Sequence, residues 1–136
     1  MTDARYRPSM HIIKGGRSGA PAALRSETFT GTVWGDPVLP QTDGVLINSV
    51  SFAPGARTHW HSHDGGQVLI VTSGSGRVYA RDGLGGEIGT GDVVFIPPGV
   101  EHWHGAGPDS PMVHTAISLQ GHDWLEPVTD DEYESG

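Results

Sequence analysis

Hydrophobic positions along this chain occur in short runs that glycine and proline interrupt every few residues. Several of these runs are rich in β-branched and aromatic residues, which favour strands. The predicted strands are Thr28–Trp34, Val45–Phe52, Thr58–His63, Gln67–Ser73, Gly76–Arg81, Val93–Ile96, His102–Ala106 and Val113–Leu119. Polar, glycine-rich segments between strands predict tight turns at Asp64–Gly66, Ser73–Gly76 and Arg81–Gly86.

No segment shows a sustained helical period, so the predicted fold class is all-β. One short helix is predicted near Thr129–Tyr133, where Thr129 can cap a turn rich in Asp and Glu. Many short antiparallel strands avoid exposed edges in a double-sheet jelly roll or barrel, which can hold a ligand cavity. The expected organisation is an N-terminal arm (1–27) with an edge strand or a partner exchange at Met10–Lys14, a barrel (28–128) and an acidic tail (129–136).

Composition narrows the classes of function. The 136 residues fit one domain, and the net charge of −8 disfavours nucleic acid and anionic membranes as partners. The chain has no cysteine, so any metal must use nitrogen and oxygen ligands. No apolar run approaches the length of a membrane span, and the first ten residues lack the apolar stretch of a signal peptide. A cytoplasmic location is therefore expected.

Histidines gather in two segments of the chain. His59, His61 and His63 alternate along one predicted strand, and alternate side chains of a strand share one face. A second predicted strand carries His102 and His104. Two such groups from distant strands can converge on one cation, because neutral imidazole is the commonest protein ligand of divalent transition metals. Trp60 and Trp103 have the opposite parity and are expected in the core or at a dimer interface.

The spacing of these residues resembles the two motifs of the cupin family. The first motif lies on Gly55, His61, His63, Gln67 and Gly74, and the second lies on Gly91, Pro97, Gly99 and His102. The resemblance implies a single-domain cupin jelly-roll β-barrel that binds one divalent transition metal. The ligands it implies are His61, His63, Gln67 and His102, with His59 outside the ligand set.

Gln67 departs from the family pattern, which usually has Glu at this position. Four neutral ligands leave the full divalent charge on the ion, which lowers the pKa of bound water and holds anions more tightly. The alternative is a site of three histidines and water in which Gln67 is not a ligand. The spacing does not identify the metal; Mn(II) is expected from the resemblance described next, and Fe(II), Ni(II), Co(II) and Zn(II) stay open.

Longer segments resemble a group of small bacterial cupins that includes the manganese-dependent cupin hydroxynitrile lyases and the carboxymuconolactone-decarboxylase-associated cupins. The segments are Ala56–His63, Gln67–Thr72, Gly91–Val94, His102–Ala106 and Trp124–Tyr133. This resemblance implies catalytic roles for Thr58, His104 and His114. Ser118 stands where these lyases have Gln, a departure at the site. The candidate substrate-binding residues are Asn48, His59 and Ser118.

The predicted function is a metal-dependent reaction on a small substrate that carries a hydroxyl or carbonyl oxygen. His104 or His114 would move the proton, and the other role open to each is to orient the metal ligands. Reversible cleavage of a cyanohydrin to an aldehyde and cyanide is the sharpest form of this prediction. Two alternatives remain, an iron dioxygenase with three histidines acting on a catechol-like substrate and a non-catalytic metal-dependent binding or sensing module. A homodimer is expected.

Overall fold

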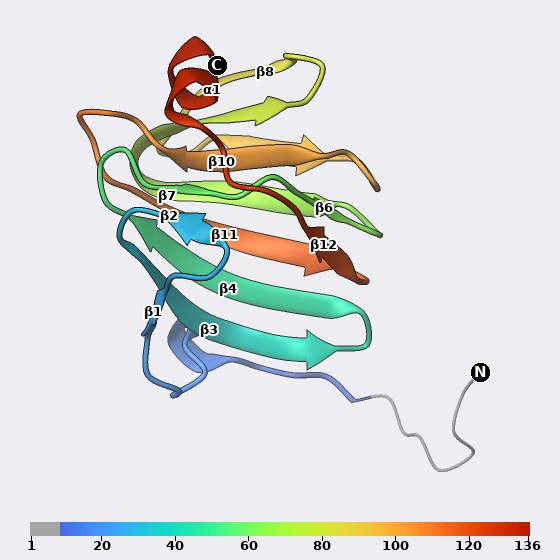
Figure 1. Ribbon diagram of the computed structural model, residues 1–136. Coiled ribbons are helices and arrows are strands. Elements are labelled where there is room, and N and C mark those ends of the chain that lie inside the picture. Colours follow the sequence, from blue (N-terminus) through green and yellow to red (C-terminus); the bar gives the residue numbers. More distant parts are fainter. Residues whose placement is uncertain (1–8) are drawn as a thin grey trace.

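The computed structural model describes residues 9–136, and in this part of the chain strands dominate (Figure 1). The strands are β1 (Ala23–Arg25), β2 (Phe29–Thr30), β3 (Val33–Thr42), β4 (Val45–Phe52), β5 (Arg57–Thr58), β6 (His61–His63), β7 (Gln67–Ala80), β8 (Gly85–Gly89), β9 (Val93–Ile96), β10 (His102–Ala106), β11 (Met112–Leu119) and β12 (His122–Trp124). A 3-10 turn, η1 (Lys14–Gly16), precedes them and a helix, α1 (Asp130–Ser135), follows them. No helix within residues 9–136 is long and apolar enough to cross a membrane.

The strands form one antiparallel arrangement that curls into a nearly closed barrel (Figure 1). Its main path runs β1-β3-β4-β11-β7-β10-β5-β2, while β8 and β9 pair with β7. Strand β6 pairs with β10 and with β12, so β12 adds an outer strand beside the histidine-bearing β6. The predicted all-β barrel is therefore confirmed.

Strand β7 corrects one prediction. The expected hairpin turn at Ser73–Gly76 is wrong, because β7 runs unbroken through it for 14 residues. The first half of β7 pairs with β11 and β9, and its second half pairs with β10 and β8. Gly74 has φ 75, and a Cβ atom there would collide with the carbonyl oxygen of Pro111. The glycine therefore bends the strand from one sheet into the other instead of reversing it.

Other boundaries also differ from the predictions. The predicted strand Thr28–Trp34 is divided at Gly31, which has φ 84, and β3 then extends through two prolines to Thr42. The expected edge strand at Met10–Lys14 is wrong, because among the described residues the arm pairs only through β1. Strands β1, β8 and β12 were not predicted, since each is short and lacks the β-branched runs that favour strands.

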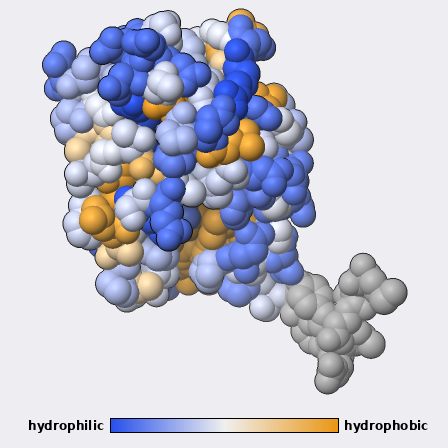
Figure 2. Space-filling view, viewed as in Figure 1, coloured by the Kyte–Doolittle hydropathy of each residue, from blue (hydrophilic) through white to orange (hydrophobic). Residues whose placement is uncertain are grey.

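Buried apolar side chains form three clusters. The largest lies between the sheets and contains Val33, Phe52, Val71 and Met112, among others, and the smallest contains Leu69, Ile96 and Ala116. The second packs Trp60, Trp103 and Val128 around Tyr133 of α1, so the two tryptophans lie in the core. On the face seen in Figure 2, surface apolar side chains form separate patches between hydrophilic residues.

Helix α1 packs on the barrel through Tyr133. Thr129 caps it with a complete capping box, as its sequence indicated. Tyr133 is buried, its hydroxyl donates to the Ala106 carbonyl at 2.7 Å, and its ring lies against the guanidinium groups of Arg57 and Arg77. The acidic end of the chain is therefore packed against the barrel and not simply a solvated tail.

Candidate active site

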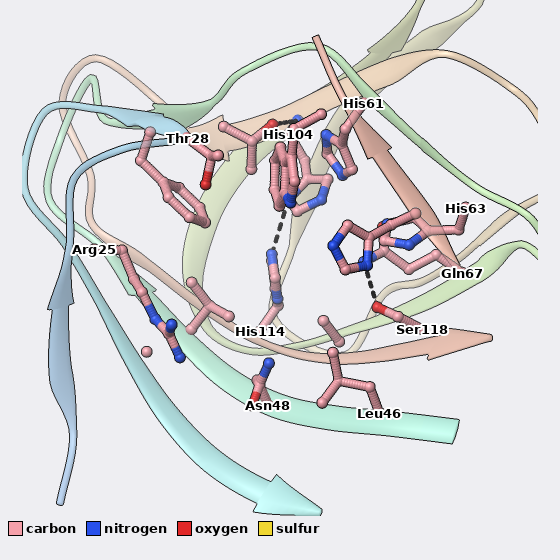
Figure 3. A pocket seen from close by; sticks show the side chains of 17 residues that line it. Arg25, Thr28, Leu46, Asn48, His61, His63, Gln67, His104, His114 and Ser118 are labelled. Carbon is pink, nitrogen blue, oxygen red and sulfur yellow. Dashed lines mark hydrogen bonds between the residues drawn. The ribbon is translucent and has the colours of Figure 1, made fainter. Parts of the chain in front are cut away.

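A cavity of about 260 Å³ opens between the two sheets and is lined by residues from both (Figure 3). Of the candidate residues from the sequence, those that line it are Asn48, Thr58, His61, His63, Gln67, His104, His114 and Ser118. Strand pairing explains the convergence: His102 lies opposite His61, and Ser118 lies opposite Gln67. Alternation along β11 then buries His114, Ala116 and Ser118 on the same side.

Three histidines form the tightest group of candidate metal ligands. One ring nitrogen from each of His61, His102 and His104 lies within 4.8 Å of the others. His63, which the family motif places in the ligand set, is slightly farther, with ring centroids 5.1 Å from His61 and 5.9 Å from His102. Both ring nitrogens of His63 are nevertheless buried without a hydrogen-bond partner. The structure thus adds His104 to the residues that the motif brought together.

Backbone carbonyls fix the orientation of two of these rings. The Nδ1 of His61 lies 2.9 Å from the His59 carbonyl oxygen, and the Nδ1 of His102 lies 2.9 Å from that of Val100. A carbonyl only accepts, so each Nδ1 carries the proton and each Nε2 keeps a lone pair for a metal. This arrangement is the one that metal-binding histidines need.

Gln67 faces this group with its amide. Its Nε2 donates to Ser118 Oγ at 3.0 Å, and its Oε1 lies 3.1 Å from His102 Nε2. With the His102 proton on Nδ1, two acceptors face each other, and a shared cation would resolve that contact. The reversed amide would donate to His102 and accept from the Ser118 hydroxyl. Ser118 therefore supports Gln67 in either orientation, and the donor set fits a divalent metal.

His104 of this cluster forms a buried pair with His114. The His114 Nε2 lies 3.0 Å from the His104 Nδ1, so one nitrogen donates and the other accepts (Figure 3). The remaining ring nitrogens of the pair, His104 Nε2 and His114 Nδ1, are buried and have no hydrogen-bond partner. Thr58 Oγ1 accepts from the His104 backbone N–H at 3.2 Å and so anchors this part of β10.

Burial keeps these histidines neutral. Loss of solvation lowers the pKa of His63 and of His114 to about 4. The same cause lowers the pKa of His61, His102 and His104, with neighbouring histidines adding to the effect at His61 and His104. Neutral imidazoles have lone pairs for a metal or a proton near pH 7. No carboxylate lines the cavity within the described chain, and Arg25 supplies its one permanent charge.

Lowering the pH from 7 to 5 should destabilise the metal-free protein. The pKa of His114 is about 4 in the folded state against 6.5 for an unperturbed histidine, so only the unfolded chain takes up the proton between these values. The free energy of unfolding is therefore lower at pH 5 than at pH 7, by about 2 kcal/mol from His114 alone. Urea denaturation at both pH values measures the change. A His114→Asn variant should show a smaller decrease, and equal stability of the unmodified protein at pH 7 and pH 5 would contradict the argument.

The structure places His59 outside the cavity, which corrects the strand-parity argument. Strand β5 ends at Thr58 and β6 begins at His61, so alternation is broken between them. The His59 backbone N–H donates to the Thr28 carbonyl at 2.8 Å, and its own carbonyl orients the His61 ring. The His59 side chain is not among the residues that line the cavity, its backbone positions His61, and its contact with substrate stays a prediction.

Several lining residues were missed because they lie on elements that the sequence did not predict. Strand β12 brings His122 and Trp124 to the cavity, and the Trp124 ring stacks on His61 with centroids 4.6 Å apart. Phe29 lies beside Trp124, with ring centroids 5.7 Å apart, and Arg25 reaches the cavity from β1. The alternating His122-Asp-Trp124 was the one available signal of a strand here.

Comparisons with known proteins agree with this geometry. A family model described as a cupin domain matches residues 48–118. A protein of Granulicella tundricola named (R)-mandelonitrile lyase is 49% identical over 114 residues, which cover 79% of this chain and 87% of the relative.

Solved structures show the same fold. A cupin-like protein from Thermotoga maritima has a TM-score of 0.78 and 46% identity, over 82% of this chain and 89% of that one. A polyketide cyclase from Streptomyces resistomycificus has a TM-score of 0.68 at 20% identity, over 95% of this chain and 92% of that one, and shows the likeness of fold alone.

Proposed function

We propose that this chain, which belongs to the cupin family, is a metal-dependent lyase that acts on a small substrate bearing a hydroxyl or carbonyl oxygen. Cleavage of a cyanohydrin to an aldehyde and cyanide is the sharpest form of the proposal. The observation that carries it is the buried contact of His114 with His104, 3.0 Å between ring nitrogens, where His104 is itself a member of the three-histidine group. The relative named (R)-mandelonitrile lyase, 49% identical, supports the same reaction.

The residues that would hold the metal are the imidazoles of His61, His63 and His102 and the Gln67 amide oxygen, which leaves the His104 Nε2 for the proton. Their lone pairs are free, because the rings are neutral and the Nδ1 protons of His61 and His102 are held by carbonyls. A divalent ion held there would supply a Lewis acid for a hydroxyl or carbonyl oxygen of the substrate. Mn(II) is our first choice, and the donor set also accepts Fe(II), Co(II), Ni(II) or Zn(II).

The His104–His114 pair would move the proton. One of the two outer nitrogens, His104 Nε2 or His114 Nδ1, keeps a lone pair when the other ring nitrogens share one proton, and it can take up the proton of the substrate hydroxyl; the 3.0 Å contact then lets the pair share the added charge. As the proton leaves, the C–O bond becomes a carbonyl and the C–C bond breaks, with its electron pair leaving on cyanide. Return of the proton releases hydrogen cyanide, so no oxidant or reductant is consumed.

The remaining walls of the cavity suit an organic substituent. Phe29, Val50, Leu46 and Trp124 give it an apolar surface, while Asn48 and Ser118 offer polar groups from β4 and β11. An aryl group would contact the aromatic side and place its hydroxyl toward the histidines. This division of polar and apolar lining is typical of small-molecule sites.

Mandelonitrile cleavage tests the proposal. Protein loaded with Mn(II) or Fe(II) should form benzaldehyde, followed by its absorbance, faster than the same protein after metal removal by chelation. The proposed lyase activity is wrong if loaded and stripped protein do not differ. Oxygen uptake with a catechol by the iron-loaded protein would then favour the dioxygenase alternative, and tight metal binding with neither activity would favour a binding module.

The expected homodimer and cytoplasmic location stay predictions.

A further inference from the structure

Arg25 lies at the solvent-exposed rim of the cavity, and its charge has no partner among residues 9–136. The other arginines of residues 9–136 each lie within 4.0 Å of a carboxylate, in the pairs Arg17–Asp36, Arg57–Asp130, Arg77–Glu87 and Arg81–Glu101. Arg25 forms no ion pair or hydrogen bond with any residue in this described part of the chain. It lines the same cavity as the histidines, and Figure 3 shows its side chain extending inward from β1.

Gly35 of β3 makes room for this side chain. A Cβ atom at Gly35 would collide with Arg25 Nε and would lie 2.8 Å from its Nη2 and 2.9 Å from its Cζ. The φ of Gly35 is not in the left-handed region, so the backbone does not require glycine here. The missing side chain instead lets the guanidinium lie across β3, where β1 pairs with it, at the edge of the cavity.

The side chains that line the cavity have a positive net charge, although the net charge of the protein is −8. No Asp or Glu lines the cavity in the described chain, so no carboxylate there offsets the charge of Arg25. A divalent ion with only neutral ligands would keep its full charge, so ion and guanidinium would stand in one cavity with no compensating carboxylate. An anionic ligand supplies the missing charge.

We propose that Arg25 binds the carboxylate of the natural substrate, which makes that substrate a small hydroxy or oxo acid and not a neutral compound. The planar guanidinium matches a carboxylate with two parallel hydrogen bonds. The inference rests on the proposed function, because the hydroxyl or oxo group would lie toward the same histidines. Phe29 and Trp124, both lining the cavity, favour an aromatic substituent between the two polar groups. Mandelonitrile then tests the reaction while lacking the group that Arg25 recognises.

Binding of mandelate and of mandelamide tests this assignment. The two compounds share the ring and the hydroxyl and differ in charge, and calorimetric titration gives both dissociation constants. Metal-loaded protein should bind mandelate about tenfold or more tightly than mandelamide, since a charged hydrogen bond contributes about that much. Arg25→Gln should lower this ratio severalfold, to the part that the ion alone supplies, and Gly35→Ala should also lower it by displacing the guanidinium. Arg17→Gln removes an arginine outside the cavity and should leave the ratio unchanged.

Measurements on protein stripped of metal separate the effect of Arg25 on mandelate binding from the effect of the ion. Arg25 should keep a preference for mandelate in stripped protein, and Arg25→Gln should remove it. No preference in the unmodified protein, or a preference that Arg25→Gln leaves intact, would overturn the inference. The readout is independent of turnover. A protein that prefers mandelate through Arg25 but does not cleave mandelonitrile contradicts only the lyase proposal, and one that cleaves it without this preference contradicts only the role of Arg25.

Discussion

The double variant His61→Ala, His102→Ala should lose the bound divalent metal while the barrel still folds. These two rings are the pair whose Nδ1 protons are held by carbonyls, which leaves both Nε2 lone pairs directed to the candidate site. Their ring centroids lie 4.2 Å apart, so they are the closest pair of the cluster. Elemental analysis of purified protein measures the metal, and far-UV circular dichroism checks the fold.

His59→Ala is the matched control for that experiment. His59 contacts His61 only through its backbone carbonyl, which alanine retains, so its metal content should equal that of the unmodified protein. Single variants His63→Ala and His104→Ala then decide between the two remaining imidazoles, since the true ligand should lower metal affinity more. Metal retained at one ion per chain in the folded double variant would show that the assignment is wrong.

Three strands were predicted with the bounds that the structure shows. Val45–Phe52, Val93–Ile96 and His102–Ala106 have the predicted bounds, because each pairs along its whole length with neighbours in the sheet. At Gly74 the same local reasoning failed. A glycine of positive φ is typical of a turn, and only the contact with Pro111, a residue far along the chain, identifies it as a bend within a continuous strand.

Some residues of the candidate site could be predicted from local spacing, and others could not. The spacing along a short segment was enough to predict that His61, His63 and Gln67 reach the cavity. They belong to two consecutive strands, β6 and β7, which a tight turn joins. Local spacing could not predict Arg25 and Trp124. They lie on the short strands β1 and β12, whose positions depend on pairing with β3 and β6. His59 differs from its prediction for a related reason: His59 and Trp60 lie between β5 and β6 and belong to neither strand, so the alternation on which the prediction depended is broken there.

His114→Ala should lower the rate of mandelonitrile cleavage by about 10²–10⁴-fold, the usual contribution of general acid–base catalysis. His114 is fully buried and its Nε2 contacts His104 at 3.0 Å, so its loss leaves the pair without its second site for the proton. Metal content should stay constant, because His114 is not a member of the three-histidine group. Initial rates at saturating substrate, alongside elemental analysis, separate these two effects.

His114→Gln and His122→Ala complete the argument. Glutamine can keep a hydrogen bond to His104 but cannot take up the proton, so it should be as slow as alanine if His114 acts as a base. If instead His114 only orients His104, glutamine should restore most of the rate. His122 lines the same cavity on β12 and has no hydrogen bond to the pair among the described residues, so His122→Ala should change the rate less than tenfold, by about the effect of lost packing alone. Equal losses in His114→Ala and His122→Ala would show that the rate depends on the shape of the cavity and not on a proton held by the pair.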